Sequence, residues 1–471
     1  MNDTSYDHKN ARLLLIGSSI SIMLAGFTAL AISTAMPDIA SALHGKHMYP
    51  VAFGIPLVGQ LIATPIAGAI TDARGAKKPL IIGFILFLLG LIVCGLAPEI
   101  NLFILGRALQ GFAGGFLMVP VYALVGLFVP PIKRAFFFAC FALSWVIPAI
   151  FGPVLAGKIV EAGHWRWIFL GVIPFVIAAA SVIIPVLFNL PKYNKIINTK
   201  DKHVILTATT TGIAIGLIMI FSILPPVLYY LKIIGIVFSL SVCIYCAPKL
   251  FPKGTFTLKK GIPAVIATRG LSNALFVALE SFIPLILQIG RGYSPSQSGI
   301  VLTIGTLSYA CGSLVQGKIE NPKLAMRIPQ FGAILAFVGT CMTITSIFTF
   351  VHIYVSVLGW LITGFAVGLI YPAMSVIILS IVPQEKHGEA SSKLQLADTL
   401  GSSTALATVT TLFSVMFIFP KPWPYIPVIT LGLIIAILAV LSSTRLYTND
   451  LQSNLSDKFL KYRSNYEYEN I

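Results

Sequence analysis

Charged residues are scarce in this chain. Asp, Glu, Lys and Arg make up 10% of its 471 residues, whereas hydrophobic residues make up 57%. A soluble domain carries about 25% charged residues. Because so few charges cannot cover a folded surface in water, the composition excludes an ordinary soluble protein. We predict an integral membrane protein that is solvated largely by the lipid bilayer.

Acidic residues are especially few, with 16 against 32 lysines and arginines, and the net charge is +16. An excess of this size could indicate nucleic-acid binding. The cations, however, occur in twos and threes between apolar runs, with no basic stripe interleaved with aromatic residues. This placement is typical of the cytoplasmic loops of membrane proteins, so we predict no nucleic-acid partner.

Motifs for metal binding and catalysis are also missing. All six cysteines lie in apolar runs, and the CxxC pattern at Cys243 and Cys246 has no second pair. No HExxH motif or paired-aspartate motif lies in an apolar run, and the seven histidines fall mostly at the ends of such runs. The sequence therefore predicts no metal, no cofactor and no enzymatic activity. A membrane-embedded enzyme or a receptor remains as a remote alternative.

Long apolar runs are abundant, and a transmembrane helix needs about 20 apolar residues. We therefore expect an all-α integral membrane fold with 14 transmembrane helices. The predicted spans lie near residues 12–36, 49–71, 79–97, 101–129, 135–158, 167–190, 204–222, 226–247, 262–289, 296–317, 328–350, 353–380, 394–418 and 424–444. An even number of spans places both termini on the same side of the membrane.

The distribution of lysine and arginine predicts the orientation. With the N-terminus inside, 24 of these residues fall in cytoplasmic segments and 5 in outer loops. Cytoplasmic loops carry an excess of Lys and Arg, so we place both termini in the cytoplasm. The longest segments between spans, 191–203 and 248–261, and the polar tail 445–471 are then cytoplasmic. None of them is long enough to form a soluble domain.

A short charged segment, Gly68–Lys78, separates two of the longest apolar runs. It contains Asp72 and the cations Arg74, Lys77 and Lys78. So short a connection makes its two flanking helices neighbours, and its cations place it on the cytoplasmic side.

Five ionisable residues lie within the predicted spans, where each charge costs at least about 2.5–3.5 kcal/mol near the bilayer centre. Lys232 lies close enough to an outer end to extend to the interface. Arg269 and Asp398 lie nearer the inner side, which favours an interfacial or structural ion pair. Arg107 and Glu280 are the leading functional candidates. A buried carboxyl group can take up and release a proton near neutral pH, and a nearby arginine favours its charged form.

Small residues cluster on two predicted helices. They lie at Gly111, Gly114 and Gly115 and, on the next span, at Gly152 and Gly157. Small residues let membrane helices approach closely. These faces either pack helices permanently or form contacts that slide during a conformational change, and the spacing leaves both interpretations open.

Several motifs together resemble the major facilitator superfamily, and within it the fourteen-span drug:proton antiporter-like branch. The segment between the second and third spans is similar to the loop signature of that superfamily: Gly68-x-x-x-Asp72-x-Arg74-Gly75-x-Lys77-Lys78. The fourth and fifth spans resemble its other motifs: Arg107-x-x-Gln110-Gly111, Gly152-Pro153-x-x-x-Gly157 and then Trp165-Arg166-Trp167-Ile168-Phe169. The junction after the ninth span also resembles that branch: Pro284-Leu285-Ile286-Leu287-Gln288 and Gly292-Tyr293-Ser294-Pro295-x-x-x-Gly299.

The resemblance implies an architecture and a mechanism. It implies an N-terminal six-helix half (1–190), cytoplasmic loops with two linker helices (191–261), a C-terminal six-helix half (262–444) and a cytoplasmic tail (445–471). It implies alternating access, with the substrate bound near the bilayer midplane between the halves. A segment of the second half, Gly312–Lys318, occupies the place that the charged segment has in the first half.

The resemblance also implies roles for single residues. A cytoplasmic gate would involve Gly68, Asp72, Arg74, Gly75 and Lys77. Proton coupling or the substrate cavity would involve Arg107, Glu280, Gln110 and Trp145. Helix packing of the antiporter type would involve Gly111, Gly152, Pro153 and Gly157.

One departure from the branch is important for coupling. The branch commonly has an acidic residue in its first span, and the corresponding stretch here, Phe27–Pro37, contains none. Glu280 is our predicted substitute.

We therefore predict a secondary transporter that exports a small amphipathic or hydrophobic solute in exchange for protons. It would act as a monomer in the plasma (inner) membrane. Aromatic residues at midplane depth, such as Trp145, Phe276 and Tyr309, suit such a solute, although they could equally serve packing. An importer or an uncoupled facilitator of a small metabolite is the alternative. The identity of the substrate does not follow from the sequence.

Overall fold

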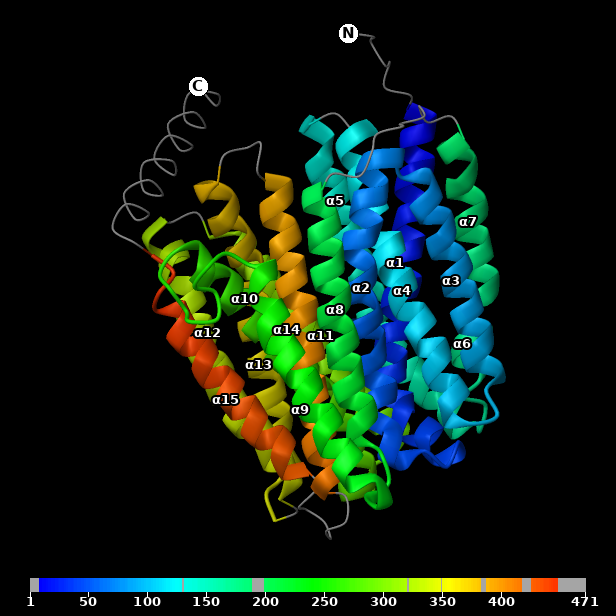
Figure 1. Ribbon diagram of the computed structural model, residues 1–471, viewed down its shortest axis with the longest axis vertical. Coiled ribbons are helices and arrows are strands. Elements are labelled where there is room, and N and C mark those ends of the chain that lie inside the picture. Colours follow the sequence, from blue (N-terminus) through cyan, green and yellow to red (C-terminus); the bar gives the residue numbers. More distant parts are fainter. Residues whose placement is uncertain are drawn as a thin grey trace. The chain divides into compact units, whose positions relative to one another are not determined.

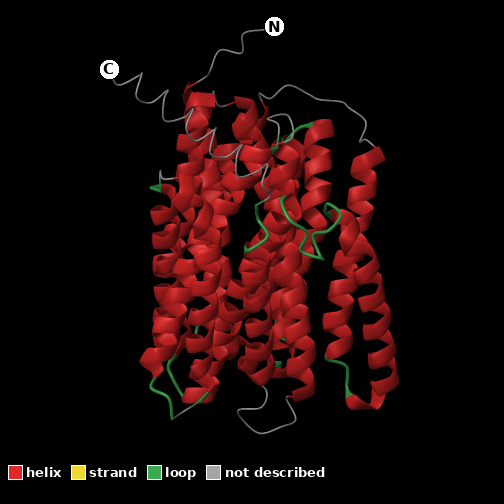
Figure 2. Cartoon of the chain, turned by 90° about the vertical axis from the view of Figure 1, so that its left-hand side faces the viewer, coloured by secondary structure: helices red, strands yellow, loops and turns green. Residues whose placement is uncertain are grey.

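A computed structural model of the protein describes residues 8–128, 131–188, 199–319, 322–348, 350–382, 387–416 and 425–447. Regular structure in these residues is helical, with short loops between the helices (Figures 1 and 2). Helices are expected where apolar runs lie in lipid, because a helix satisfies its backbone polar groups within one segment. Most of the predicted tail and most of the 191–203 segment lie outside the described residues.

The long helices follow the predicted apolar runs along the chain. They are α1 (His8–Ala42), α2 (Tyr49–Arg74), α3 (Lys77–Leu96), α4 (Ile100–Phe128), α5 (Pro131–Glu161), α7 (Ile173–Phe188), α8 (Thr199–Ser222), α9 (Tyr229–Cys246), α10 (Ile262–Leu285), α11 (Pro295–Gly317), α12 (Pro322–Ile344), α13 (Ile353–Ile381), α14 (His387–Met416) and α15 (Ile426–Ser443). A short helix, α6 (Trp167–Leu170), precedes α7, and α10 continues into a π-helical turn at Ile286–Gly290.

By length and composition, 12 helical segments of the described chain could span a membrane. Helix α14 is not among them; it is rich in serine and threonine and carries Lys393 and Asp398. Helix α15 contributes a shorter apolar stretch, Thr430–Ser443. The structure therefore gives an all-helical, multi-span protein.

The chain forms two compact units. Unit 1 comprises Met1–Cys246, Ile283–Thr303 and Leu406–Phe417, and unit 2 comprises Ala247–Phe282, Ile304–Ala405 and Ile418–Ile471. In unit 1, α4 packs against α2 and α3, and α1 packs against α5 and α7. In unit 2, α12 packs against α13 and α15.

Glycines allow α4 to lie directly against its neighbours. A Cβ atom at Gly111 would overlap the backbone of Pro56 on α2, and one at Gly106 would lie 2.9 Å from the backbone nitrogen of Cys94 on α3. A Cβ at Gly115 would lie 2.7 Å from the Cβ of Ala63. Such contacts leave no room for a larger residue, which is the use of glycine expected between membrane helices.

Helix α13 repeats this arrangement in unit 2. Gly359, Gly364 and Gly368 have the same spacing along α13 as Gly106, Gly111 and Gly115 have along α4. A Cβ at Gly359 would meet the backbone of Thr343 on α12, and Cβ atoms at Gly364 and Gly368 would overlap the backbones of Gly305 and Tyr309 on α11. The chain thus uses one packing pattern twice. When the three glycines of α13 are aligned with those of α4, Trp360 corresponds to Arg107 and Thr363 corresponds to Gln110.

Candidate functional site

Arg107 is buried on α4, with 7% of its surface exposed. Its Nη1 donates a hydrogen bond to Oε1 of Gln110 at 2.6 Å, and its Nε donates a longer one, 3.4 Å, to the carbonyl oxygen of Ala52 on α2. Arg107 and Gln110 lie three residues apart, so both project from the same face of α4. The structure therefore brings these two predicted residues together.

The charge of Arg107 has no carboxylate partner in the described part of the chain. The salt bridge between Arg269 and Asp398 does not involve it. In addition, Nε2 of Gln110 is buried and has no hydrogen-bond partner among the described residues. A buried charge or amide without a partner loses its hydration without compensation, so this pair is an expensive feature of the fold.

Glu280 is also buried, with 9% of its surface exposed. Its Oε1 has no hydrogen-bond partner among the described residues. An isolated carboxylate is costly to bury, whereas the protonated carboxyl group is tolerated far better. This environment is the one expected of a group that holds a proton for part of a cycle.

The backbone beside Glu280 is also unusual. Pro284 lies four residues after Glu280, has no N–H and cannot donate to the carbonyl oxygen of Glu280. Two residues after Pro284 the helix widens into the π-helical turn Ile286–Gly290, where Nε2 of Gln288 donates to the carbonyl oxygen of Thr34 at 3.0 Å. Both features interrupt the regular α-helical hydrogen bonding just after Glu280, and π-turns of this kind are frequent at functional sites.

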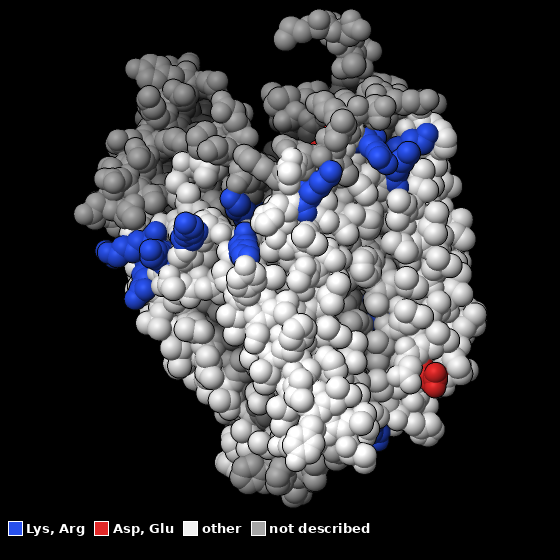
Figure 3. Space-filling model, in the orientation of Figure 1, with Lys and Arg blue, Asp and Glu red and all other residues white. Residues whose placement is uncertain are grey.

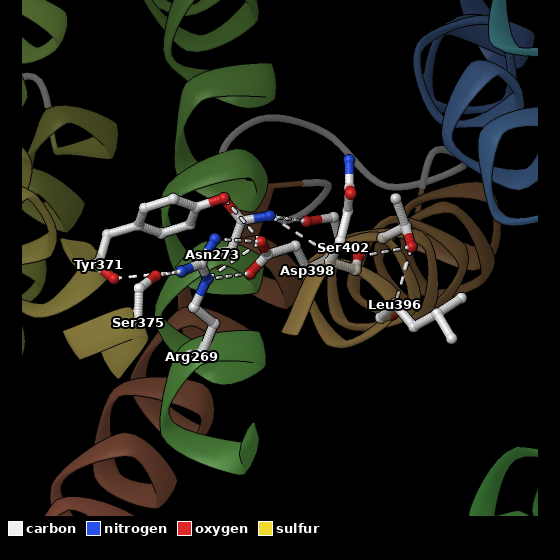
Figure 4. Close-up of polar contacts among 9 residues, drawn as sticks. Arg269, Asn273, Tyr371, Ser375, Leu396, Asp398 and Ser402 are labelled. Carbon is white, nitrogen blue, oxygen red and sulfur yellow. Dashed lines mark hydrogen bonds and ion pairs between the residues drawn. The ribbon is translucent and has the colours of Figure 1, made fainter. Parts of the chain in front are cut away.

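Arg269 and Asp398 form the ion pair that the sequence predicted as one possibility (Figure 4). The Nη2 atom of Arg269 lies 2.9 Å from Oδ2 of Asp398, and its Nε donates to both carboxylate oxygens. The hydroxyl of Tyr371 donates to Oδ2 at 2.6 Å, and the guanidinium lies 3.4 Å from the centre of the Tyr371 ring. Both charges are buried and both are compensated.

This ion pair connects three helices of unit 2. Arg269 on α10 also donates to the carbonyl oxygen of Tyr371 and to the hydroxyl of Ser375, both on α13. Asn273, one turn after Arg269, donates to the carbonyl oxygen of Asp398 and to the hydroxyl of Ser402 on α14. The network therefore holds α10, α13 and α14 together (Figure 4).

An aromatic cluster continues along the same face of α10. Phe276 stacks on Trp360 with ring centres 4.8 Å apart and lies 5.6 Å from Tyr309, which in turn lies 6.1 Å from Tyr371. Residues 269, 273, 276 and 280 follow one another at helical spacing, so the ion pair, the amide, the aromatic ring and the carboxyl group form one stripe. Phe276 thus separates the compensated charges from Glu280.

The charged segment between α2 and α3 is shorter than the sequence indicated. Helix α2 continues through Asp72 to Arg74, and only Gly75 and Ala76 lie between it and α3. Gly75 has φ +81°, a conformation that favours glycine, and its N–H caps α2 by donating to the carbonyl oxygen of Thr71. Asp72 and Arg74 are exposed, and Nζ of Lys77 lies 3.5 Å from the ring centre of Phe188.

Two of the candidate glycines, Gly68 of the gate and Gly152 of the fifth-span motif, have room around them. A Cβ at Gly68 would meet only Val119 within 4 Å, at 3.9 Å, and one at Gly152 would approach its neighbours no closer than 3.7 Å. Helix packing therefore does not require glycine at either position.

The fifth-span motif packs tightly against the start of α11. A Cβ at Gly157 would lie 2.6 Å from Cα of Ser296, and one at Gly299 would lie 2.5 Å from the carbonyl oxygen of Pro153. The carboxylate of Glu161 accepts a hydrogen bond from the N–H of Ser296 at 3.1 Å.

Trp145 lies elsewhere on α5. It packs against Gly26 of α1, and 43% of its surface is exposed. Among the candidates for the coupling site, Arg107, Gln110 and Trp145 lie in unit 1, and Glu280 lies in unit 2.

A family model describes most of this chain. The model of the Major Facilitator Superfamily matches residues 18–406. The chain belongs to the Major Facilitator Superfamily. It is therefore a multi-pass membrane transporter for small molecules and not an enzyme, as the sequence predicted.

Curated relatives in the superfamily are distant but cover most of the chain. Multidrug resistance protein 3 of Bacillus subtilis (strain 168) is 24% identical over 406 residues, which are 83% of this chain and 77% of that protein. The multidrug efflux pump SdrM of Staphylococcus aureus (strain N315) is 26% identical over 418 residues, 86% of this chain and 90% of SdrM.

Solved structures in the superfamily share the fold. The POT family transporter PepTSo aligns with a TM-score of 0.64 at 11% identity, over 95% of this chain and 98% of that one. A D-xylose–proton symporter aligns with a TM-score of 0.63 at 14% identity, over 92% of this chain and 97% of the symporter. At these identities the likeness concerns the fold alone.

Sequence reasoning missed the partners of the buried charges in this superfamily member. Asn273 and Tyr371 complete the surroundings of Asp398, yet neither was a candidate. A signal for Asn273 was present, because it lies one turn after Arg269 on the same helix face. Tyr371 lies 102 residues from Arg269 and 27 residues from Asp398 along the chain, and no local pattern indicated it.

Proposed function

We propose that this transporter exports a small amphipathic solute in exchange for protons, by alternating access. The multidrug relatives support export, because their names describe resistance and efflux. The observation that carries proton exchange is the buried carboxyl group of Glu280, with its unpartnered Oε1. A group that is neutral in one conformation and charged in another can move one proton per cycle.

For the architecture we propose fourteen spans. Residues 1–190 and 262–444 would form the six-helix halves, with α8 and α9 between them as linker helices and residues 445–471 as a cytoplasmic tail. The serine- and threonine-rich α14 would be a span despite its polarity, because its Asp398 is compensated by Arg269. The transporter would act as a monomer in the plasma (inner) membrane.

For the orientation we propose cytoplasmic termini. In unit 1 the lysines and arginines visible in Figure 3 gather mainly toward the end at which α1 begins in Figure 1. This distribution supports a cytoplasmic position for that end, since positive charge collects on the cytoplasmic side.

The segment from Gly68 to Lys77 would act as a cytoplasmic gate, with Asp72 and Arg74 at the exposed end of α2. We expect Asp72→Asn to slow transport severalfold without weakening binding of the solute, because the change touches the gate and not the binding site. Initial rates and equilibrium binding on the same preparation test this expectation. Loss of binding with an unchanged maximal rate would contradict a gate.

The proposed function can be tested on wild-type protein in proteoliposomes with an acidic lumen. Three fluorescent amphiphiles serve as probes: cationic ethidium, neutral Nile red and anionic 8-anilinonaphthalene-1-sulfonate. We expect at least one to accumulate in the lumen as protons leave it, and a protonophore to abolish the accumulation. Equilibration of every transported probe without regard to the pH gradient would indicate an uncoupled facilitator. Accumulation only with an alkaline lumen would indicate cotransport with protons.

A further inference from the structure

The Arg107–Gln110 pair presents hydrogen-bond donors that the protein does not use. Arginine has five N–H donors and no acceptor, and Gln110 uses its acceptor oxygen to receive Nη1 of Arg107. This hydrogen bond fixes the amide, so its Nε2 is directed away from the guanidinium. Nε2 of Gln110 is buried and donates to no residue in the described ranges. The hydrogen bonds of the Arg107 guanidinium to the described residues come from its Nε and Nη1. What is missing beside this pair is an acceptor.

The missing acceptor must also carry negative charge. Arginine does not lose its proton in proteins, so Arg107 cannot escape the cost of burial by becoming neutral. Within the described residues no aspartate or glutamate pairs with it; the ion pair of Arg269 and Asp398 lies in unit 2. An uncompensated buried charge destabilises a fold by several kcal/mol, and an anion would remove most of that penalty.

Helix packing does not explain why arginine occupies this position. In α13, which repeats the glycine spacing of α4, Trp360 corresponds to Arg107 and Thr363 to Gln110. Trp360 is fully buried and stacks on Phe276. An uncharged aromatic side chain, whose single N–H is also without a partner among the described residues, thus fills this place in unit 2, whereas unit 1 places a cation and an amide there.

We propose that Arg107 and Gln110 form a binding site for a single anionic head group, and that the transported solute is an anionic amphiphile. This assignment rests on the transport function proposed above. A carboxylate or sulfonate offers acceptors that suit the planar guanidinium, and the Gln110 amide supplies a further donor. Export of an anion is also favoured by a membrane potential that is negative inside, by about 2.3 kcal/mol per charge for each 100 mV.

The test measures binding to purified full-length protein in nanodiscs, without any pH gradient, by the shift in melting temperature. Three probes share one tail: octanesulfonate, octyltrimethylammonium and octanol. Sodium chloride at equal concentration tests an inorganic anion. We expect stabilisation by octanesulfonate to exceed that by the other two amphiphiles. Stabilisation by chloride alone would assign the site to an inorganic ion and overturn the claim about the solute.

Two variants locate the binding. Arg107→Gln should abolish selective stabilisation by octanesulfonate. Gln110→Met, which keeps the side-chain volume, should weaken the affinity for octanesulfonate about tenfold, the effect of one lost charged hydrogen bond. Gln110→Met keeps the test valid if Arg107→Gln does not fold. Glu99→Gln, a change at an exposed position outside both proposed sites, should bind octanesulfonate as wild type does.

Equal stabilisation by all three amphiphiles, or unchanged selectivity in both variants, would overturn the proposal. Failure of the proposed function gives different results from failure of the anion site. If ethidium alone accumulates in the gradient experiment, proton-driven export stands and the anionic solute is wrong. If octanesulfonate binds as expected but no probe responds to the gradient, the anion site stands and proton exchange is wrong.

Discussion

Replacing Glu280 by glutamine is expected to abolish accumulation driven by the pH gradient while leaving exchange of solute across the membrane intact. The glutamine has nearly the same shape as the protonated carboxyl group, so the fold and the solute site should be preserved. It cannot release a proton, so the step that couples protons to the conformational change is lost. Initial rates in proteoliposomes, measured with and without the gradient, separate the two activities.

A matched control comes from an exposed carboxyl group. Glu99 precedes α4 and is exposed, so Glu99→Gln makes the same chemical change outside the buried stripe of α10. We expect vesicles with Glu99→Gln to accumulate the probe, driven by the pH gradient, as wild-type vesicles do. If Glu280→Gln retains gradient-driven accumulation at the wild-type level, Glu280 is not the proton carrier.

The second large effect is expected at the ion pair of unit 2. Asp398→Asn should destabilise the protein by about 3–5 kcal/mol, because it leaves the Arg269 charge buried without a counter-charge. It also weakens the acceptor for Tyr371. The free energy of unfolding in a mild denaturing detergent, measured against wild type, gives the size of the effect.

The double variant Arg269→Gln/Asp398→Asn makes this prediction specific. It removes both charges, so we expect it to be more stable than Asp398→Asn alone, although one residue more has been changed. The pair does not hold α10, α13 and α14 together in the way we infer if the double variant loses the sum of the unfolding free energies lost by the two single variants. The same holds if Asp398→Asn lowers the free energy of unfolding by less than about 1 kcal/mol.

The sequence predicted those parts of the fold that depend on local composition. Runs of about 20 apolar residues mark membrane helices, so the long helices lie where they were expected. The charges in those runs stood out against the apolar residues around them. For Arg269 and Asp398, their position near the inner side favoured an interfacial or structural ion pair, and the structure shows that they pair with each other.

Features that depend on tertiary contacts could be predicted less well from the sequence. The spacing of Gly68–Lys78 indicated a loop, whereas α2 continues to Arg74 because Asp72 and Arg74 are compatible with a last helical turn. The contact between Gly157 and Ser296 joins residues more than 130 positions apart. The unpartnered atoms of Gln110 and Glu280 could not be predicted either, because a missing partner is a property of the whole surroundings.

The central claim is that Glu280 carries the proton that is exchanged for solute. It is tested most directly in proteoliposomes that contain a pH-sensitive dye and the transported probe inside, with no initial pH gradient and no probe outside. Outflow of the probe should acidify the lumen of wild-type vesicles, because protons enter in exchange, and should leave the pH unchanged with Glu280→Gln. The same acidification in the variant, or a lumen that becomes alkaline in wild type, would contradict the account.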